Sequence, residues 1–498
     1  MVGKTVDLVL INPGGQRQIY QILADTFTAK EPPVWAGLLA TYIRRRGFSV
    51  EIIDANAEDL SPEEVAKRVV TENPLLVGVV VYGHQPSAST QVMPAAGLIC
   101  RVLKERAPEL KVIMLGGHVA ALPERTLREE ATDFVCSGEG PYTVWKLLEV
   151  MKAGRLDYDS VPGLWYFKGD QVKATNPAPL IDFDKDIPEG VAWDLLPVDK
   201  YRAHNWHCFG FINRRQPYAS TYTTLGCPFK CAFCCINAPF GGSSYRLRDP
   251  KHVAEELDIL VQKYKVKNLK IADEMFVVNI KHVSEICDLI IERGYDLNIW
   301  AYARVDTVRR EGLLEKMKKA GFNWLALGIE SGTSKVRDSV NKSFQQDTIY
   351  HSIEKIRKAG INVVGNYILG LPEDNYDTMQ ATLDLAIDLC TEWANFYVCM
   401  AYPGSALYER AVKEGWPLPK DWSGYSQHSI DTFPLPTKYL SGGEVLSFRD
   451  HAFQTYFTNP KYLSYIENKF GSETVEHIKE MVKIKLVRRF AAPLSFVK

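Results

Sequence analysis

Short apolar runs alternate with helical patterns along the first third of the chain. Strands are predicted where Val, Ile and Leu cluster in short runs, and helices where apolar residues recur every three or four positions. In chain order the predicted strands and helices cover residues 6–12, 34–46, 50–54, 62–71, 76–82, 93–106, 111–115, 123–130, 133–136 and 141–151. Repeated strand–helix alternation predicts a five-stranded, doubly wound parallel sheet within residues 1–155.

Residues 156–217 have a different composition, with many Pro, Asp and aromatic residues. Only one strand-like pair is visible there, at residues 163–167 and 171–174. Segments of this kind usually join larger units, so the sequence predicts a connector between two domains.

A second series of alternating runs follows the connector. Its predicted strands are residues 219–225, 268–271, 297–303, 324–329, 361–369 and 394–401. Six strand–helix steps predict a partial, TIM-type (β/α)6 barrel over residues 218–405. Residues 406–498 have a mostly helical pattern and form a predicted C-terminal, substrate-side domain.

Composition and charge exclude several classes of protein. The chain of 498 residues has 59 Lys and Arg against 60 Asp and Glu, so its net charge of −1 lacks the basic excess that nucleic-acid binding normally needs. Hydrophobic residues at 46% and charged residues at 24% are typical of a soluble globular protein. Ten scattered cysteines favour a reducing, cytoplasmic setting over a disulfide scaffold.

Neither export nor membrane insertion is expected from the apolar segments. The longest stretch without acidic or basic residues, 73–100, is interrupted by Pro86 and Pro94, and the first residues lack the layout of a secretory signal. No stable membrane insertion is therefore predicted.

Three cysteines stand together after the first predicted barrel strand, in Cys227-Pro228-Phe229-Lys230-Cys231-Ala232-Phe233-Cys234. The C-x3-C-x2-C spacing puts three thiolates on one loop, enough to hold three irons of a [4Fe–4S] cluster. A structural zinc site normally has a fourth protein ligand. Cys235 directly follows Cys234 and is therefore poorly positioned to bind the same metal. The spacing favours a cluster with one open iron; the alternative is three cysteines in a buried loop.

This loop resembles the signature of the radical S-adenosylmethionine (SAM) superfamily, C-x3-C-x-aromatic-C, with Phe233 in the aromatic position. The resemblance implies that Cys227, Cys231 and Cys234 ligate the cluster and that the open iron binds the methionine moiety of SAM. One electron then cleaves SAM to a 5′-deoxyadenosyl radical, and an external donor such as a flavodoxin or ferredoxin supplies that electron.

Other strand ends resemble the SAM-contacting motifs of the superfamily. Asp273 or Glu274 would hydrogen-bond the SAM ammonium, unless they cap the following helix. Arg304 and Lys342 are cations that would pair with the SAM carboxylate, unless they are surface charges.

Two further motifs extend this resemblance. Glu330 or Ser331, in Gly328-Ile329-Glu330-Ser331-Gly332, would bind the ribose hydroxyls. Ile368 begins a run similar to the adenine motif, but Asn366 replaces its leading glycine, which leaves the details of the adenine contact open. Phe233 completes the predicted SAM-binding set.

The loops after the N-terminal strands are rich in Gly and small polar residues, which let a large flat ligand approach the backbone. Ligands of doubly wound sheets bind at these carboxyl ends. The first loop lacks the G-x-G-x-x-G fingerprint of dinucleotide sites. The candidate binding residues are Asn12, Gly14, Tyr82, His84, Gln85, Ser87, Gly116, Gly117, His118, Ser137, Gly138, Glu139 and Gly140.

The N-terminal sheet resembles the Rossmann-like cobalamin-binding domain of cobalamin-dependent radical SAM enzymes. Residues 32–47, the Gly116-Gly117-His118 loop and Gly138-Glu139-Gly140 carry the resemblance. It implies that the candidate residues contact cobalamin. The D-x-H-x-x-G motif is absent, so no histidine of that motif would ligate cobalt; His84 would ligate it or would only hydrogen-bond nearby. A sheet without cofactor is the remaining alternative.

The two cofactors together imply methylation of an unactivated carbon of a small molecule. The resemblance implies that the 5′-deoxyadenosyl radical removes a hydrogen atom from the substrate and that methylcobalamin supplies the methyl group. A rearrangement, ring contraction or oxidative cyclisation would use the same cofactors, and an iron–sulfur electron-transfer or sensor protein is a non-catalytic alternative.

Three segments bear on the substrate without identifying it. Residues 204–208 (His-Asn-Trp-His-Cys) would reach the space between the domains or form a buried linker. The aromatic C-terminal region, with Trp416, Trp422, Tyr425 and Phe433, would cover the barrel mouth or belong to the core. Residues 483–498 mix basic and apolar positions and predict a docking helix or contact with a membrane surface.

Overall fold

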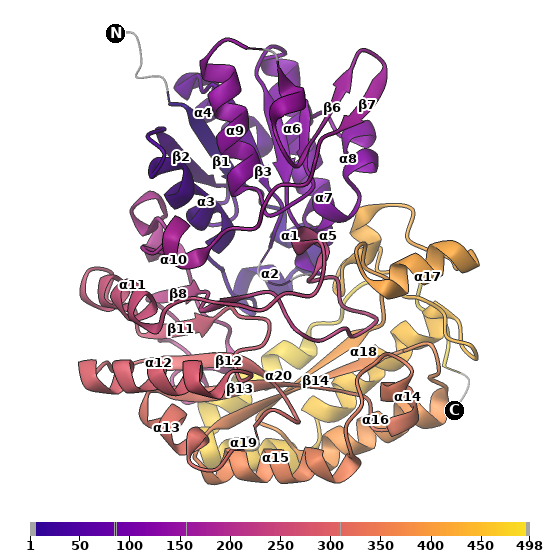
Figure 1. Ribbon diagram of the computed structural model, residues 1–498. Helices are drawn as coiled ribbons and strands as arrows, with labels where there is room; N and C mark the ends of the chain where they lie inside the picture. Colours follow the sequence, from indigo (N-terminus) through magenta and orange to yellow (C-terminus); the bar gives the residue numbers. More distant parts are fainter. Residues whose placement is uncertain (1–5, 84, 86, 156, 309, 495–498) are drawn as a thin grey trace.

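The computed structural model describes residues 6–83, 85, 87–155, 157–308 and 310–494. A mostly parallel sheet lies above a fully parallel one, and the C-terminal helices, drawn in yellow, pack beside the lower sheet (Figure 1). His84 lies outside the described residues.

The N-terminal sheet has seven strands in the order β2-β1-β3-β4-β5-β6-β7. They are β1 (Leu8–Asn12), β2 (Val50–Asp54), β3 (Leu76–Val80), β4 (Val112–Leu115), β5 (Phe134–Cys136), β6 (Leu164–Lys168) and β7 (Gln171–Ala174). The five predicted parallel strands are confirmed. The prediction that the pair at 163–174 is part of a separate connector is wrong, because β6 pairs antiparallel with β5 and covers a three-residue strand that would otherwise form an open edge.

Helices cover both faces of this sheet because its strands alternate their side chains. In β1, Leu8 and Leu10 pack with α3 and α9, whereas Val9 and Ile11 pack with α4 and α6. The helices of this half are α1 (Gln16–Tyr20), α2 (Leu23–Thr26), α3 (Val34–Arg44), α4 (Pro62–Glu72), α5 (Ala88–Gln91), α6 (Met93–Arg106), α7 (Gly117–Ala121), α8 (Pro123–Glu129), α9 (Pro141–Lys152) and, in the connector, α10 (Phe183–Asp186).

The second sheet has six parallel strands in the order β15-β14-β13-β12-β11-β8, which confirms the six-step partial barrel. The strands are β8 (Tyr218–Thr221), β11 (Asn268–Ile271), β12 (Asn298–Arg304), β13 (Phe322–Glu330), β14 (Asn362–Leu369) and β15 (Trp393–Val398). Helices α11 (Pro250–Gln262), α12 (Ile280–Arg293), α13 (Leu313–Lys319), α14 (Ser334–Asp338), α15 (Gln346–Lys358) and α16 (Tyr376–Leu389) alternate with them. Over the described residues no ladder joins β8 to β15, so the sheet stays open.

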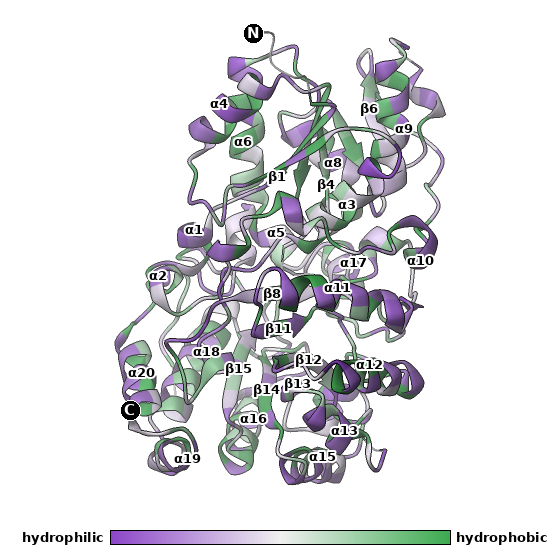
Figure 2. Cartoon of the chain, turned by 90° about the vertical axis from the view of Figure 1, so that its left-hand side faces the viewer, coloured by the Kyte–Doolittle hydropathy of each residue, from purple (hydrophilic) through white to green (hydrophobic). Residues whose placement is uncertain are grey.

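The C-terminal region is mostly helical, as expected. Its helices are α17 (Ala406–Glu414), α18 (Gly442–Phe457), α19 (Pro460–Phe470) and α20 (Ser472–Lys483). Helix α18 packs on the edge strand β15. Hydropathy colouring shows green strands inside both halves and purple positions on the outer turns of the helices (Figure 2). No described helix has the length and apolar character of a membrane span.

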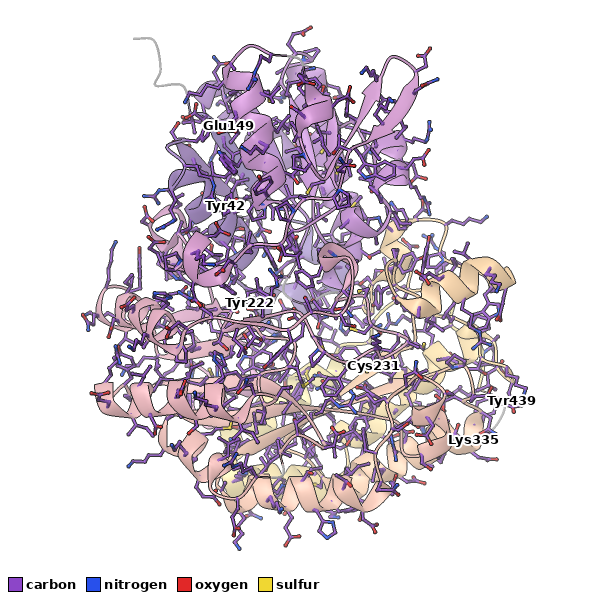
Figure 3. The ribbon with its side chains drawn as sticks, in the orientation of Figure 1. Tyr42, Glu149, Tyr222, Cys231, Lys335 and Tyr439 are labelled. Carbon is purple, nitrogen blue, oxygen red and sulfur yellow. The ribbon has the colours of Figure 1, made fainter. Side chains whose placement is uncertain are left out.

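The carboxyl ends of the two sheets face one another. Tyr82, which follows β3, and Tyr222, which follows β8, line the same small cavity. Tyr222 and Cys231 lie in the band where the two halves meet (Figure 3). The loops that the sequence singles out in each half therefore share one interdomain space.

Candidate active site between the two sheets

A short antiparallel ladder closes the stem of the cysteine loop. Strand β9 (Thr224–Leu225) pairs with β10 (Arg246–Leu247), and the three cysteines lie between them. Gly226 has φ +82°, and a Cβ there would lie 2.5 Å from the carbonyl oxygen of Ser244. Only glycine fits this turn without strain. The backbone N–H of Cys234 donates to the carbonyl of Cys231 at 3.1 Å, which folds the loop tightly.

The three thiols lie in a largely buried setting with two cations nearby. Burial raises the pKa of the Cys227 thiol to about 11 and also raises the pKa values of Cys231 and Cys234. The positive charges of Lys342 and Arg304 oppose this effect at Cys231, and Arg304 Nη1 lies 3.8 Å from the Cys231 sulfur. A cation beside a thiol favours the thiolate that iron requires.

The donor set fits a cluster better than a single ion. Within the described ranges, no three His, Cys, Asp or Glu side chains converge on one metal position. In an iron–sulfur cluster each thiolate binds a different iron, so the sulfur atoms need not converge. The loop geometry therefore suits the cluster that the cysteine spacing predicts.

A cavity of about 260 Å³ adjoins the cysteine loop and collects most of the predicted SAM-binding residues. Its wall includes Cys234 and residues from the ends of five strands of the barrel. The predicted SAM residues that line it are Phe233, Glu274, Glu330, Lys342 and Ile368, and the predicted cobalamin residues Gln85 and Ser87 join them from the upper sheet.

The two acidic residues after β11 have different environments. Both carboxylate oxygens of Asp273 accept hydrogen bonds from Thr223, at 2.6 Å each, and Asp273 does not line the cavity. Glu274 lines the cavity, and its buried Oε2 has no hydrogen-bond partner in the part of the chain that the structure describes. Burial, reinforced by Asp273, raises the pKa of Glu274 to about 8. Of the two, Glu274 has the carboxylate available to a ligand.

Glu330 and Lys342 form a buried ion pair on the cavity wall. Glu330 has φ +64°, a strained conformation for a residue with a side chain, and such strain gathers at functional sites. Ser331 and Arg304 do not line the cavity. The hydroxyl of Ser331 lies 3.3 Å from that of Thr382, and Arg304 donates to Asp306 at 2.9 Å.

Two smaller cavities lie against the upper sheet. One, of about 60 Å³, is lined by Asn12, Gly14 and Tyr82, and the other, of about 20 Å³, by Tyr82, Gln85 and Gly117. The ring of Tyr82 stacks on Trp35 at 4.4 Å, so both cavities have an aromatic wall. The structure brings these predicted cobalamin residues to neighbouring cavities, and their contact with cobalamin stays a prediction.

Of the other predicted cobalamin residues that the structure describes, Ser87 lines the 260 Å³ cavity and the rest line none of these cavities. Gly116 packs against the backbone of Val81, and His118 is buried between Thr90 and the ring of Trp422. Ser137, Gly138, Glu139 and Gly140 follow β5; the Glu139 carboxylate is taken up by Arg246 and by the backbone N–H of Ile181. Their roles at a cofactor remain predictions.

A cavity of about 480 Å³ lies beside the SAM-side cavity. Tyr302, Asn366, Tyr397 and Gln427 line both, so the two spaces are neighbours that share walls. The connector contributes His204, Asn205 and Trp206, which places that segment in the interdomain space. His207 instead contacts the carbonyl of Asn298 at 3.0 Å.

Sequence reasoning missed several residues that line these spaces. Tyr222, Tyr302, Tyr397 and Tyr402 stand at cavity walls but belong to no motif, and Trp35 lies within the 32–47 motif but is not among the predicted binding residues. Three of them, Tyr222, Tyr302 and Tyr397, lie within or directly after a barrel strand, and this position was the only signal in the sequence.

Comparisons with known proteins agree with both halves of this architecture. Residues 221–386 match the model of the radical SAM superfamily, and residues 20–148 match that of the B12 binding domain. The chain is a cobalamin-dependent radical SAM enzyme. Its cofactors are a [4Fe–4S] cluster, SAM and cobalamin.

Relatives of this radical SAM enzyme include methyltransferases and cyclases. An uncharacterised methyltransferase of Pyrococcus horikoshii is 29% identical over 92% of this chain and 94% of its own length. An anaerobic magnesium-protoporphyrin IX monomethyl ester cyclase of Rubrivivax gelatinosus is 27% identical over 87% of this chain and 75% of its own.

Two solved structures share the fold of the radical SAM enzyme. The methyltransferase TsrM of Kitasatospora setae, solved with cobalamin and a [4Fe–4S] cluster, has a TM-score of 0.68 at 16% identity and covers 92% of this chain and 90% of its own. OxsB, solved with aqua-cobalamin and SAM, has a TM-score of 0.70 at 17% identity over 96% of this chain and 72% of its own. At these identities the likeness concerns the fold.

Proposed function

We propose that this enzyme transfers a methyl group to an unactivated carbon of a small molecule. The observation that carries the proposal is the meeting of the two halves. Glu274 and Cys235 line both the cavity beside the cysteine loop and the cavity against the upper sheet. A substrate between these two cavities would be accessible to SAM from the barrel side and to cobalamin from the side of the upper sheet. When bound, the cluster and SAM supply a hydrogen-abstracting radical, and cobalamin supplies the methyl group.

In this proposal Cys227, Cys231 and Cys234 hold the cluster. Glu274 accepts a hydrogen bond from the SAM ammonium, because it lines the cavity and its Oε2 has no hydrogen-bond partner among the described residues. Glu330, Lys342, Phe233 and Ile368 surround the rest of the SAM-side cavity. Asp273 supports the site through Thr223 and stays out of direct contact.

Cobalamin is proposed to contact the loops after β1, β3 and β4. Asn12, Gly14, Tyr82, Gln85, Ser87 and Gly117 are the predicted residues that already line the interdomain cavities. No described histidine of residues 6–155 lines these three cavities; His118 lies outside them, against Thr90 and Trp422.

The direct test is incubation of the reconstituted enzyme with reductant, candidate substrates and SAM that carries a labelled methyl group. Methylation predicts label in the product together with 5′-deoxyadenosine, methionine and S-adenosylhomocysteine. Formation of 5′-deoxyadenosine with a changed but unlabelled product would contradict methyl transfer.

A second candidate is oxidative cyclisation, which the cyclase of Rubrivivax gelatinosus favours as a relative. It uses the same cavities but transfers no methyl group. Mass spectrometry of the product separates the two, because methylation adds about 14 mass units per methyl group, whereas a cyclisation that closes a ring by loss of hydrogen lowers the mass.

A further inference from the structure

The wall of the 480 Å³ cavity has a basic part that the SAM and cobalamin residues do not explain. Arg449 and Asp450, on α18, and Lys485, which follows α20, line the 480 Å³ cavity. None of the three lines the SAM-side cavity. The C-terminal helices therefore bring their own charges to the interdomain space.

Arg449 is buried and only partly bonded. Its Nε donates to the carbonyl of Phe396 at 2.8 Å, and its Nη1 donates to Asp450 at 2.8 Å. Over the described chain, Nη2 makes no hydrogen bond. The Arg449 side chain is only 7% exposed, so its charge lies largely out of bulk solvent.

The negative charge of Asp450 is shared between two arginines. Arg488, whose side chain is 4% exposed, binds both oxygens of Asp450, at 3.0 and 3.1 Å. Two guanidinium groups thus face one carboxylate, and one positive charge is left over. The positive charge also affects the nearby His428. Burial, and after it the charges of Arg449 and Arg488, hold the pKa of His428 well below its ordinary value.

The acidic group elsewhere on the cavity wall does not cancel this excess. Glu31 is matched by Lys270 at 3.5 Å and accepts from the Tyr218 hydroxyl at 2.7 Å. Lys485 adds a further positive charge at the rim and forms no ion pair with another described residue. A buried charge without a counter-charge is costly, by several kcal/mol in typical cases, so this part of the wall calls for an anionic ligand.

We propose that Arg449 and Lys485 bind an anionic group of the substrate, a carboxylate or a phosphate. The inference rests on the proposed function, since it treats the 480 Å³ cavity as the substrate site. Nη2 of Arg449 donates to the anion, and Lys485 approaches it from the rim. The aromatic wall, which includes Trp206, Trp300 and Tyr302, packs against the apolar or ring-containing remainder of the substrate.

Binding of small anions tests the proposal without knowledge of the substrate. The holoenzyme, loaded with cluster, cobalamin and SAM, is titrated in a calorimeter with benzoate, phenyl phosphate and the neutral benzyl alcohol. Benzoate or phenyl phosphate is expected to bind at least about tenfold more tightly than benzyl alcohol, the factor expected from one charge-assisted hydrogen bond. The ranking of the two anions identifies the preferred group.

Variants assign that binding to the proposed residues. Arg449→Met is expected to weaken anion binding by about tenfold or more, and Lys485→Ala by a smaller factor because its charge is exposed to solvent. Asp450→Asn removes the negative charge that lies beside Arg449 and is expected to strengthen anion binding. Arg489→Met is the matched control: it lies on the same tail, pairs with Asp431 at the surface and does not line the cavity.

Equal affinity of wild type and Arg449→Met for the anions would overturn the inference, as would equal affinity for benzoate and benzyl alcohol. Anion binding that disappears when cobalamin is loaded would also overturn it, because the basic wall would then belong to the cofactor. Reductive cleavage of SAM is followed separately. Its loss contradicts the proposed function, whereas its retention without anion binding contradicts only the assignment of Arg449 and Lys485.

Discussion

Glu274 combines a buried carboxyl group with an unsatisfied oxygen at the edge of a cavity. A group of this kind lowers the stability of the empty protein and gains a partner when a cationic ligand binds. Stability at such a residue is given up for binding, which is common at functional sites. The consequences can be measured on the protein without substrate.

Replacement of Glu274 by Gln is expected to remove part of the pH dependence of stability. The pKa of Glu274 is about 8 in the folded state, above the value of about 4.3 usual in unfolded chains. Between these values the folded state holds a proton that the unfolded state has released, so the free energy of unfolding falls as pH rises, by at most about 1.4 kcal/mol per pH unit. Denaturant unfolding of the SAM-free protein at pH 5 to 8 checks this, and an identical slope for wild type and Glu274→Gln would contradict it.

The cysteine loop gives a second prediction at this scale. Cys231→Ala is expected to abolish incorporation of the cluster, because a cluster with an open iron needs all three thiolates. Cys235→Ala, one residue beyond the motif, is the matched control and is expected to keep its iron. Iron content and the visible absorption of the reconstituted proteins distinguish them; equal iron in both variants would refute the ligand assignment.

Single residues also mark the limit of the sequence analysis. The cysteine spacing predicts a cluster loop directly, since all its information is local. Asp273 and Glu274 cannot be separated in this way, because neighbouring side chains near a strand end point in different directions and the sequence does not tell which one faces the cavity. Thr223, the partner of Asp273, lies 50 residues away in the chain.

At the scale of elements, one buried acid joins helix α19 to the barrel through an ion pair. Glu392, just before β15, has no exposed side-chain surface and pairs with Lys469 of α19 at 2.6 Å and with Arg357 of α15 at 3.4 Å. It also accepts from the backbone N–H of Val363 at 2.9 Å. The positive charges of Arg357 and Lys469 lower the pKa of Glu392 against the opposing effect of burial.

Glu392→Gln is expected to destabilise the protein by about 3–5 kcal/mol, the usual cost of breaking a buried ion pair from one side. The loss should appear as a lower midpoint in chemical denaturation and as faster hydrogen exchange in α19. Glu476→Gln, which breaks an exposed pair with Lys479, is the control and should change stability by less than about 1 kcal/mol. A similar small change at Glu392 would show that α19 is anchored elsewhere.

Most elements follow from the pattern of the sequence, because both sheets are built from local strand–helix repeats. The pairing of β6 with β5 does not, although the hairpin itself is visible at residues 163–174. The hairpin pairs with β5 because β5 has a free edge in the folded sheet. The local sequence pattern does not show which strand of the sheet has a free edge. The C-terminal aromatic residues present the same difficulty: Tyr425 is buried, whereas Trp422 borders His118 of the other half.

At the scale of the whole molecule, one ion pair connects the upper sheet to the cysteine loop. Arg246 of β10 binds Glu139, which follows β5, and donates to the carbonyl of Ile181 at 2.8 Å. Because β10 also closes the stem of the cysteine loop, the contact joins the cobalamin half to the cluster half.

Arg246→Met is expected to loosen the two halves, because it leaves the carboxylate of Glu139 buried and unpaired. Less cobalamin should stay bound after gel filtration, measured from the absorption of the released cofactor, while the iron content is kept because the β9–β10 ladder uses backbone atoms. Arg45→Met breaks an exposed pair with Glu189 and is the control. Unchanged cobalamin retention would mean that this ion pair does not hold the halves together.

The enclosed position of the cavities also bears on how the enzyme is made. The upper half is synthesised first, and later contacts tie it to the rest of the chain, among them the backbone pairing of Lys30 with Arg202 of the connector and the hydrogen bonds of Gln21 to the C-terminal tail. A corrin bound between the halves would have to pass these contacts, so we expect it to enter most readily while the chain is still assembling. Vitamin supply during expression would then set how many molecules ever become active, and vitamin added to the finished protein would rescue few of them.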